Sequence, residues 1–256
     1  MTIKTLEPRL AKVGGVPIAR LLPNRGHQPI GAWCFLDHAG PVAFGEDDAG
    51  MQVGRHPHIN LQTFSWMLNG EVLHKDSLGN EQVITKNQVN VMTAGTGLTQ
   101  GISHTEQSIF PETGGSLDAA RGLSMVQLWI ALPTDQQIER GFHHYPKLPT
   151  WREDSAEMIL TTGSYVSVSG EHYKAPTIQY SKLVGIDVNF LEDGDVTLNL
   201  EPGFEYGVLV TEGQVESEGL ICQQDQLFRF HDADVANNSS IKLVAKKGTR
   251  VMVIGG

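Results

Sequence analysis

Hydrophobic and polar residues alternate with a period of two along much of this chain. In residues 61–66, Leu61, Thr63 and Ser65 fall on one side of an extended backbone, and the residues between them fall on the other. This alternation is typical of β-strands, whose successive side chains point to opposite faces. The same pattern predicts further strands in SMVQLWIAL (124–132), DVTLNL (195–200) and EYGVLV (205–210).

Short turns rich in glycine, aspartate and asparagine separate these runs. Together with the 28 glycines, the close spacing of the strands predicts an all-β fold with antiparallel strands in a sandwich or barrel. Helical signal is scarce: only PTDQQIERGF (133–142) is compatible with one or two helical turns. The turns are LNGE (68–71), SLGN (77–80), LEDGD (191–195), TEGQ (211–214) and KKGT (246–249).

The chain divides into two β-rich halves. The stretch HHYPKLPTW (143–151) holds two prolines and no clear periodicity, so it is typical of a connector. Each half contains a strand, a glycine turn and a strand, in WMLNGEVLH and VLVTEGQVE, which indicates a duplicated unit. We therefore expect a first domain, a connector and a second domain at residues 1–134, 135–149 and 150–256.

Composition and charge narrow the function classes. Of the 256 residues, 40% are hydrophobic and 19% charged, as in ordinary soluble globular proteins. A net charge of −10 without a basic cluster longer than Lys246-Lys247 argues against nucleic-acid binding. No apolar run approaches the roughly 18 residues of a membrane-spanning helix, and the N-terminus lacks a secretory apolar core, so we expect a cytoplasmic protein without membrane contact. Cys34 and Cys222 lie far apart and are interpreted as buried spectators.

Two pairs of side chains carry the spacing of metal ligands. His56 and His58 are two residues apart in GRHPHIN, and His104 and Glu106 repeat that spacing in GISHTE, 46 residues after His58. Residues at i and i+2 of a strand point the same way, and Pro57 suits a strand edge because it has no N–H to donate. Two such pairs facing each other would offer three imidazoles and one carboxylate to a divalent Fe, Mn, Ni, Co, Cu or Zn ion, with positions left for water or substrate.

These motifs resemble the pirin family of the cupin superfamily. The resemblance is carried by HPHINLQTFSWMLNGEVLHKDSLGN (56–80) and VNVMTAGTGLTQGISHTE (89–106), with FLDHAGP (35–41) and VQLWIALP (126–133) on either side. It covers residues from about 15 to 133 strongly and the remainder only in the order of its strands.

The resemblance implies a bicupin, with two jelly-roll β-sandwich domains in tandem and one metal ion in the first. The family pattern assigns His56, His58, His104 and Glu106 as the metal ligands and makes iron(II) the expected metal. It also implies a quercetin 2,3-dioxygenase-like activity on a flavonol or related aromatic enol and O2. In that reaction Glu106 would serve as a ligand and as the base that accepts the substrate hydroxyl proton.

This sequence departs from the family pattern in three places. Ile59-Asn60 replaces the usual Arg-Gly after His-Pro-His, which alters the surroundings of the metal. The stretch between MTAG and the ligand histidine is longer, by LTQG (98–101) or its neighbours. The chain also ends at VMVIGG (251–256), short of the C-terminal tail that many members carry.

Other histidines and aromatics receive structural interpretations. His38 and His74 are interpreted as lacking a partner at the +2 position and are predicted to be structural, with orientation of a ligand imidazole as the alternative for each. His143 and His144 are assigned to the surface or the connector. The aromatic residues of TFSWM and QLWI are expected in the core, and MTAGTG lacks the Lys-Ser/Thr ending of a phosphate-binding loop.

Three functions remain open on the sequence. The first is the O2-using dioxygenase, and the second is a non-enzymatic iron or redox sensor that binds a protein partner. The third is a metal site that is vestigial or only stabilises the fold. The second half offers Glu205 between Phe204 and Tyr206 where the first offers its His-x-His pair, so we expect its sandwich to hold no metal and to fill that place with core side chains.

Overall fold

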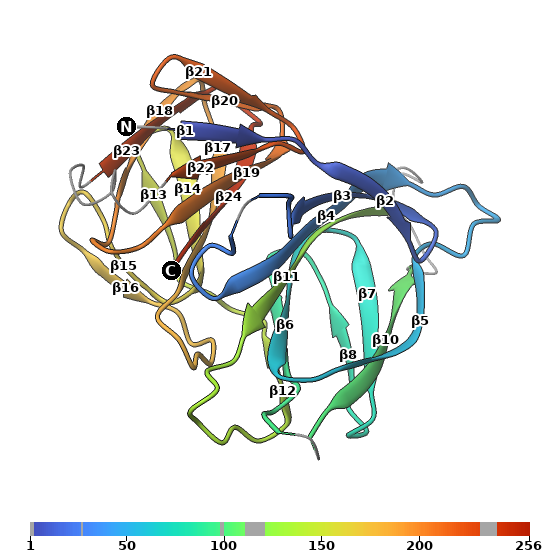
Figure 1. Cartoon of the computed structure of the whole chain (residues 1–256). Helices are drawn as coiled ribbons and strands as arrows, with labels where there is room; N and C mark the ends of the chain where they lie inside the picture. Colours follow the sequence, from blue (N-terminus) through green and yellow to red (C-terminus); the bar gives the residue numbers. More distant parts are fainter. Residues whose placement is uncertain (1–2, 27, 98–99, 111–120, 231–239) are drawn as a thin grey trace. The chain divides into compact units, whose positions relative to one another are not determined.

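The computed structural model describes residues 3–26, 28–97, 100–110, 121–230 and 240–256, and within these ranges it contains strands and turns but no helix. PTDQQIERGF forms turns and extended chain, so the helical expectation for this stretch was wrong. Among these residues there is accordingly no long apolar helix of the kind that crosses a membrane. Figure 1 shows the strands and their labels.

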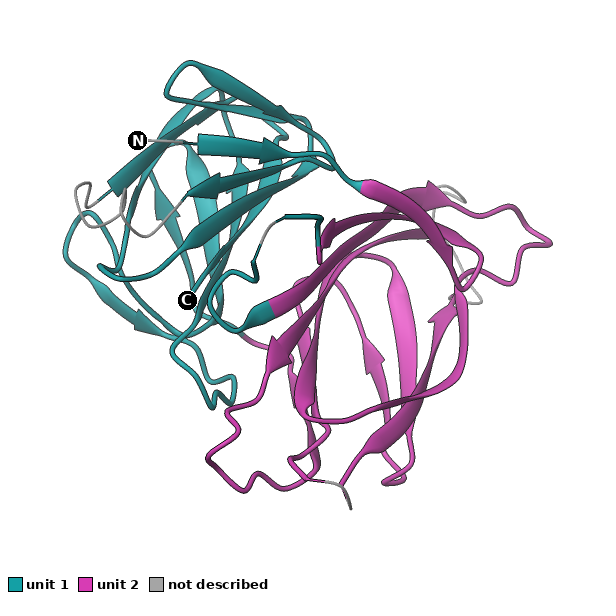
Figure 2. Ribbon diagram, in the orientation of Figure 1, with its two compact units in different colours: residues 1–8, 24–33, 148–256 teal, residues 9–23, 34–147 magenta. Residues whose placement is uncertain are grey.

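The chain forms two compact units, coloured separately in Figure 2. We call residues 9–23 and 34–147 the first sandwich, and residues 1–8, 24–33 and 148–256 the second sandwich.

The first sandwich consists of two antiparallel sheets. Seven strands follow the order β12-β9-β6-β11-β4-β3-β2, and four follow the order β5-β10-β7-β8. The strands are β2 (Arg9–Val13), β3 (Val16–Leu22), β4 (Trp33–Ala43), β5 (Gln52–His58), β6 (Leu61–Asn69), β7 (Glu71–Asp76), β8 (Glu81–Ile84), β9 (Val89–Thr93), β10 (Ile102–Ile109), β11 (Gly122–Ala131) and β12 (Gly141–Tyr145).

The second sandwich repeats this design and adds a hairpin of β15 and β16. Its seven-stranded sheet has the order β1-β22-β19-β24-β17-β14-β13, and its four-stranded sheet the order β18-β23-β20-β21. The strands are β1 (Ile3–Leu6), β13 (Thr150–Glu153), β14 (Ala156–Thr162), β15 (Ser164–Val166), β16 (His172–Lys174), β17 (Val184–Phe190), β18 (Gly194–Asn199), β19 (Tyr206–Glu212), β20 (Gln214–Ser217), β21 (Leu220–Gln223), β22 (Leu227–Phe230), β23 (Ser240–Ala245) and β24 (Arg250–Gly255).

Strand for strand, the two orders correspond. WMLNGEVLH forms β6 and β7, and VLVTEGQVE forms β19 and β20, which hold equivalent places in their sandwiches. The turn glycines Gly70 and Gly213 both have a positive φ, of 86° and 77°, which side-chain-bearing residues rarely adopt. The all-β tandem sandwich predicted from the sequence is therefore confirmed, and the echo between the halves reflects the same strand–turn–strand unit.

The boundaries differ from the expected 1–134, 135–149 and 150–256. Strand β1 pairs with β22, Ile3 opposite Phe230, and so takes in the second sandwich the edge position that β12 holds in the first. Residues 24–33 also belong to the second sandwich, where the Trp33 indole donates a hydrogen bond to the Gly255 carbonyl at 3.0 Å. Most of the expected connector instead belongs to the first sandwich, because β12 pairs with β9.

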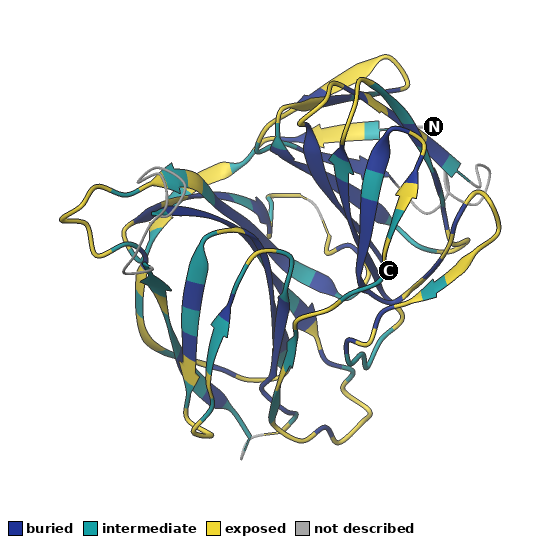
Figure 3. Cartoon of the chain, turned by 180° about the vertical axis from the view of Figure 1, so that it is seen from behind, coloured by how far each residue is buried: buried dark blue, intermediate teal, exposed yellow. Residues whose placement is uncertain are grey.

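Buried side chains line the strand faces of each sandwich, as the dark segments of Figure 3 show. Both faces of β6 are buried: Phe64 and Trp66 are core residues, as expected, and Thr63 and Ser65 are buried as well. Cys222 is buried and Cys34 partly buried, and both are free thiols. The core of the second sandwich includes Leu160, Val188, Val208, Phe228, Phe230, Leu243 and Val253.

The turn after β6 generates a stability prediction. A Cβ on Gly70 would lie 2.2 Å from the Gly122 carbonyl oxygen, whereas a Cβ on Gly79, which has nearly the same φ of 88°, would meet nothing within 4 Å. Gly79→Ala should therefore cost only the left-handed backbone penalty of about 1–2 kcal/mol. Gly70→Ala should cost about 1–3 kcal/mol more, because backbone must also shift. Urea unfolding of both variants measures this, and equal losses of stability would contradict the predicted clash.

Candidate metal centre

Strands β5 and β10 bring the two sequence motifs together. They pair antiparallel, with His104 opposite His56 and Ile102 opposite His58. Strand β5 lies at the edge of its sheet, which is where Pro57 fits because an edge strand leaves some N–H positions unpaired. His56 and His58 are two residues apart on β5, so their side chains lie on the same face of the strand and both imidazoles approach His104.

Three imidazoles converge in this place. One ligand nitrogen from each of His56, His58 and His104 lies within 4.8 Å of the others. The His58 and His104 Nε2 atoms are 3.1 Å apart, and the His56 ring centroid lies 4.9 Å from that of His58 and 4.4 Å from that of His104. Metal–nitrogen bonds of about 2.0–2.1 Å at a right angle put neighbouring nitrogens about 3 Å apart, so this spacing fits a transition metal.

Burial keeps two of these imidazoles neutral. Burial, together with a smaller effect of the neighbouring histidines, lowers the pKa of His58 to about 4 and that of His104 to about 2. A neutral imidazole carries the lone pair that a metal ion needs, so little proton competition arises at these two ligands near neutral pH. The His56 Nδ1 atom lies 2.9 Å from the Gly54 carbonyl, and its N–H there leaves Nε2 as the coordinating atom.

Glu106 lies beside this histidine group. Its carboxylate forms a second cluster with His74 and His104, again with ligand atoms within 4.8 Å of one another. The β5–β10 register shifts between His104 and Glu106, so Glu106 stands opposite Val53. Burial raises the pKa of the Glu106 carboxyl to about 7. Of the four ligands expected from the sequence, three share one cluster and the fourth joins them through His104.

His74 contacts the candidate ligand directly. Its Nδ1 lies 3.4 Å from His104 Nδ1, its Nε2 lies 3.3 Å from the Asp76 carboxylate, and its ring stacks on Phe142 at 4.4 Å. If His74 donates to Asp76, its Nδ1 can accept from His104 Nδ1–H, which leaves His104 Nε2 free to coordinate. The orienting alternative for His74 is thus the one that the geometry favours. The sequence offered a signal, because HKD places Asp76 two residues after His74.

An aromatic wall borders the histidines. A cavity of about 110 Å³ adjoins them, and Phe35 and Trp129, which line it, stack with their centroids 4.0 Å apart. Trp129 also meets the His58 ring edge-on at 5.0 Å, so the expectation that this tryptophan is core was wrong. Arg20 lies over Phe35 at 4.6 Å and donates two hydrogen bonds of 2.7 Å to Asp37.

Comparisons with known proteins bear on the family. The Pirin family model matches residues 15–130. A Pseudomonas aeruginosa protein named "Putative quercetin 2,3-dioxygenase" is 42% identical over 99% of this chain and 74% of its own length. A pirin-like protein of Caulobacter vibrioides is 31% identical over 98% of this chain and 82% of its own length. The chain belongs to the pirin family.

Two solved structures share its fold. A quercetin 2,3-dioxygenase from Acinetobacter baumannii superimposes with a TM-score of 0.86 at 39% identity, covering 99% of this chain and 78% of that one. A bacterial pirin of Escherichia coli in complex with nickel(II) has a TM-score of 0.68 at 16% identity, covering 99% and 98%, and this likeness concerns the fold alone.

The departure from the pirin pattern at Ile59-Asn60 has a backbone explanation. Asn60 has a φ of 56°, a left-handed conformation that glycine adopts freely and asparagine tolerates better than most residues. Its side-chain oxygen accepts a hydrogen bond from Gly97 N at 3.1 Å, and its own N–H donates to the Gly95 carbonyl at 3.0 Å. Ile59 is 56% exposed. Asn60 therefore fixes the start of the longer loop, in which Leu98 and Thr99 lie outside the described residues.

The remaining histidines of this sandwich have structural roles. His38 is fully buried, with its Nε2 3.3 Å from the Ser124 hydroxyl, in agreement with the structural interpretation. His144 lies in β12 opposite Asn90, whose side-chain oxygen is 2.7 Å from its Nδ1, so it is a strand residue of the sandwich and not part of a connector. The adjacent His143 is exposed.

The histidine cluster predicts about one transition-metal ion per chain. His58→Ala should remove most of the bound metal, because it deletes one of two nitrogens that face each other at 3.1 Å. The exposed His143→Ala serves as the matched control and should keep its metal. Elemental analysis of the purified variants measures the occupancy. Unchanged metal content in His58→Ala would contradict the assignment.

The raised pKa of Glu106 predicts proton release on metal binding. At pH 6, below its pKa of about 7, the carboxyl is mostly protonated in the metal-free protein and must ionise to coordinate. Binding at pH 6 should therefore release close to one proton from Glu106, and binding at pH 8 almost none. Calorimetry in buffers of different ionisation enthalpy measures the release. Glu106→Gln keeps an oxygen ligand but has no proton to lose, so an unchanged release in this variant would refute the prediction.

Proposed function

We propose that this pirin is a metal-dependent dioxygenase that cleaves a flavonol or a related aromatic enol with O2. The observation that carries the proposal is the aromatic wall of Phe35 and Trp129 directly beside three convergent imidazoles, two of them held neutral by burial. The quercetin dioxygenase names of relatives at 42% and 39% identity support the same reaction class.

The donor set fits a divalent metal ion, with iron(II) as our proposed ion and His56, His58, His104 and Glu106 as its holders. Such an ion supplies Lewis acidity for an enolate oxygen and redox chemistry toward O2. The side chains of this pirin provide orientation and proton transfer. His74 and Asp76 orient His104, and the Gly54 carbonyl orients His56.

Glu106 is our proposed acceptor of the substrate proton. Burial raises the pKa of its carboxyl to about 7 in the metal-free protein, and once a metal ion is bound the ionised carboxylate would be available to accept a proton. It lies in the cavity that also holds His56, His58 and Trp129, so a hydroxyl bound beside the histidines comes within its reach. Removal of that proton gives the electron-rich enolate that reacts with O2.

The cavity limits how much of a substrate enters. Its volume of about 110 Å³ is smaller than the roughly 300–1,000 Å³ of sites that enclose drug-sized ligands. It is closer to the cavity of about 150 Å³ that accommodates a single benzene ring. We therefore propose that the enol-bearing ring enters against Phe35 and Trp129 and that the rest of a flavonol remains at the mouth.

A turnover assay with metal analysis of the same sample tests the function. Iron-loaded protein should consume quercetin and O2 in parallel. The loss of flavonol absorbance measures the first, and an oxygen electrode measures the second. Glu106→Gln should lower the rate by about 10²–10⁴-fold, which is the usual contribution of a general base. His143→Ala should be unaffected. Full iron loading without turnover of quercetin or a one-ring enol would refute the proposal and favour a non-enzymatic role.

A further inference from the structure

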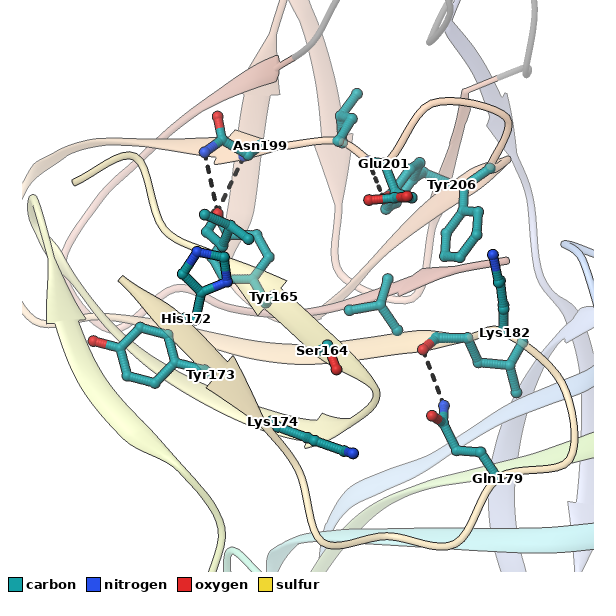
Figure 4. A pocket seen from close by; sticks show the side chains of 15 residues that line it. Ser164, Tyr165, His172, Tyr173, Lys174, Gln179, Lys182, Asn199, Glu201 and Tyr206 are labelled. Atoms are coloured by element: carbon teal, nitrogen blue, oxygen red, sulfur yellow. Dashed lines mark hydrogen bonds between the residues drawn. The ribbon is translucent and has the colours of Figure 1, made fainter. Parts of the chain in front are cut away.

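The second sandwich contains a cavity of about 610 Å³, where the sequence led us to expect a filled core. The β15–β16 hairpin, residues 179–184 and residues 199–206 form its walls. This volume lies within the range of sites that enclose small organic ligands. Figure 4 shows Ser164, Lys174 and Gln179 on one side, with Asn199, Glu201 and Tyr206 on the other.

The position of this cavity corresponds to the metal-bearing end of the first sandwich. The connection from β18 to β19 is the counterpart of the one from β5 to β6, and β5 ends at His58. Where β5 carries imidazoles, the end of β18 carries Asn199, followed by Leu200 and Glu201. Within the described ranges, both clusters with metal-ligand spacing lie in the first sandwich, so the chemistry of this second cavity must be sought in its other side chains.

One side of the cavity is aromatic and rigid. Tyr165 and Tyr206 are buried, and their hydroxyls accept hydrogen bonds from the backbone N–H groups of Asn199 at 3.1 Å and Glu201 at 2.8 Å. Phe204 lies 6.1 Å from Tyr206, ring to ring. Because hydrogen bonds from the backbone hold both tyrosine hydroxyls in place, the rings form a preformed apolar surface against which a flat ligand can pack.

Tyr173 extends this aromatic surface. It stacks on Trp151 at 4.0 Å with an interplanar angle of 9°, and Trp151 in turn lies 5.6 Å from Tyr165.

The lining of the cavity carries more positive than negative charge. Lys174 and Lys182 are exposed lining residues that form no ion pair among the described residues, and Glu201 is the one acid in the lining. Two unpaired ammonium groups beside a cavity stand out in a chain with a net charge of −10. They favour an anionic ligand, since a charge near a low-dielectric wall is screened less than one in open water.

We propose that the second sandwich binds a small aromatic carboxylate in this cavity. The ring packs against Tyr165, Phe204 and Tyr206, and the carboxylate pairs with the ammonium groups of Lys174 and Lys182. A neutral aromatic would leave the lysines without a role, and an inorganic anion would leave the aromatic wall uncovered. The site is independent of the metal centre, so its test does not depend on dioxygenase activity.

Calorimetric titration of the full-length protein with 4-hydroxybenzoate tests the proposal. Chelator-treated protein is used, so that a metal ion in the first sandwich cannot hold the carboxylate. We expect saturable binding of one molecule per chain. The neutral isostere 4-hydroxybenzamide should bind at least tenfold more weakly, and acetate should show no saturable binding. Absence of 4-hydroxybenzoate binding at millimolar concentration would overturn the proposal, as would equal affinity for the benzamide.

Variants locate the site. The double variant Lys174→Gln/Lys182→Gln should lose at least tenfold in affinity for the benzoate and little for the benzamide. Phe204→Ala should weaken both ligands. The matched control is Lys242→Gln/Lys246→Gln, which changes two exposed lysines of the same sandwich outside the cavity and should bind as the parent does. Because all four lysines are exposed, unfolding midpoints should stay close to that of the parent. Unchanged benzoate affinity in the cavity variant would refute the site.

Discussion

Burial of His58 and His104 is the constraint on which the candidate metal centre depends. An imidazole in bulk water is partly protonated near neutral pH, whereas burial lowers the pKa of these two to about 4 and about 2. The interior that imposes this shift comes from β5 and β10 pairing at the side of the sandwich where Trp129 packs against His58. The same burial raises the pKa of Glu106 to about 7, so one environment favours the neutral form of all three groups.

The two sandwiches show how one strand order supports two different cavities. Corresponding strands follow the same order in their sheets, so the backbone provides an open end in each sandwich. The residues at the corresponding strand ends differ: β5 carries His56 and His58 in the first sandwich, whereas β18 ends at Asn199, followed by Leu200 and Glu201, in the second. The second end instead gains the β15–β16 hairpin, which contributes Tyr165 and Lys174 to a cavity more than five times as large as the first (about 610 against 110 Å³).

The sequence predicted what local periodicity and short spacings encode. Alternation predicted the strands, and the i, i+2 pairs predicted which histidines converge. It did not predict that Ile3 pairs with Phe230, because an edge strand of four residues carries no signal for a partner so distant along the chain. Trp129 was assigned to the core for a related reason: a tryptophan in an alternating strand faces either packed side chains or a cavity, and only the tertiary arrangement decides which.

His74 shows where a simple spacing rule stops. The sequence interpretation gave His74 no partner at i+2 and so missed Asp76, although a carboxylate is one of the partners that fix the tautomer of an imidazole. In the structure the chain of contacts runs from Asp76 through His74 to His104 Nδ1, while His104 Nε2 faces His58. If Asp76 accepts a hydrogen bond from His74 Nε2–H, each ring along the chain has one assigned donor and one assigned acceptor. The nitrogen that is left without a proton is then the one that faces the other ligands, so the supporting pair determines which atom of His104 can bind a metal.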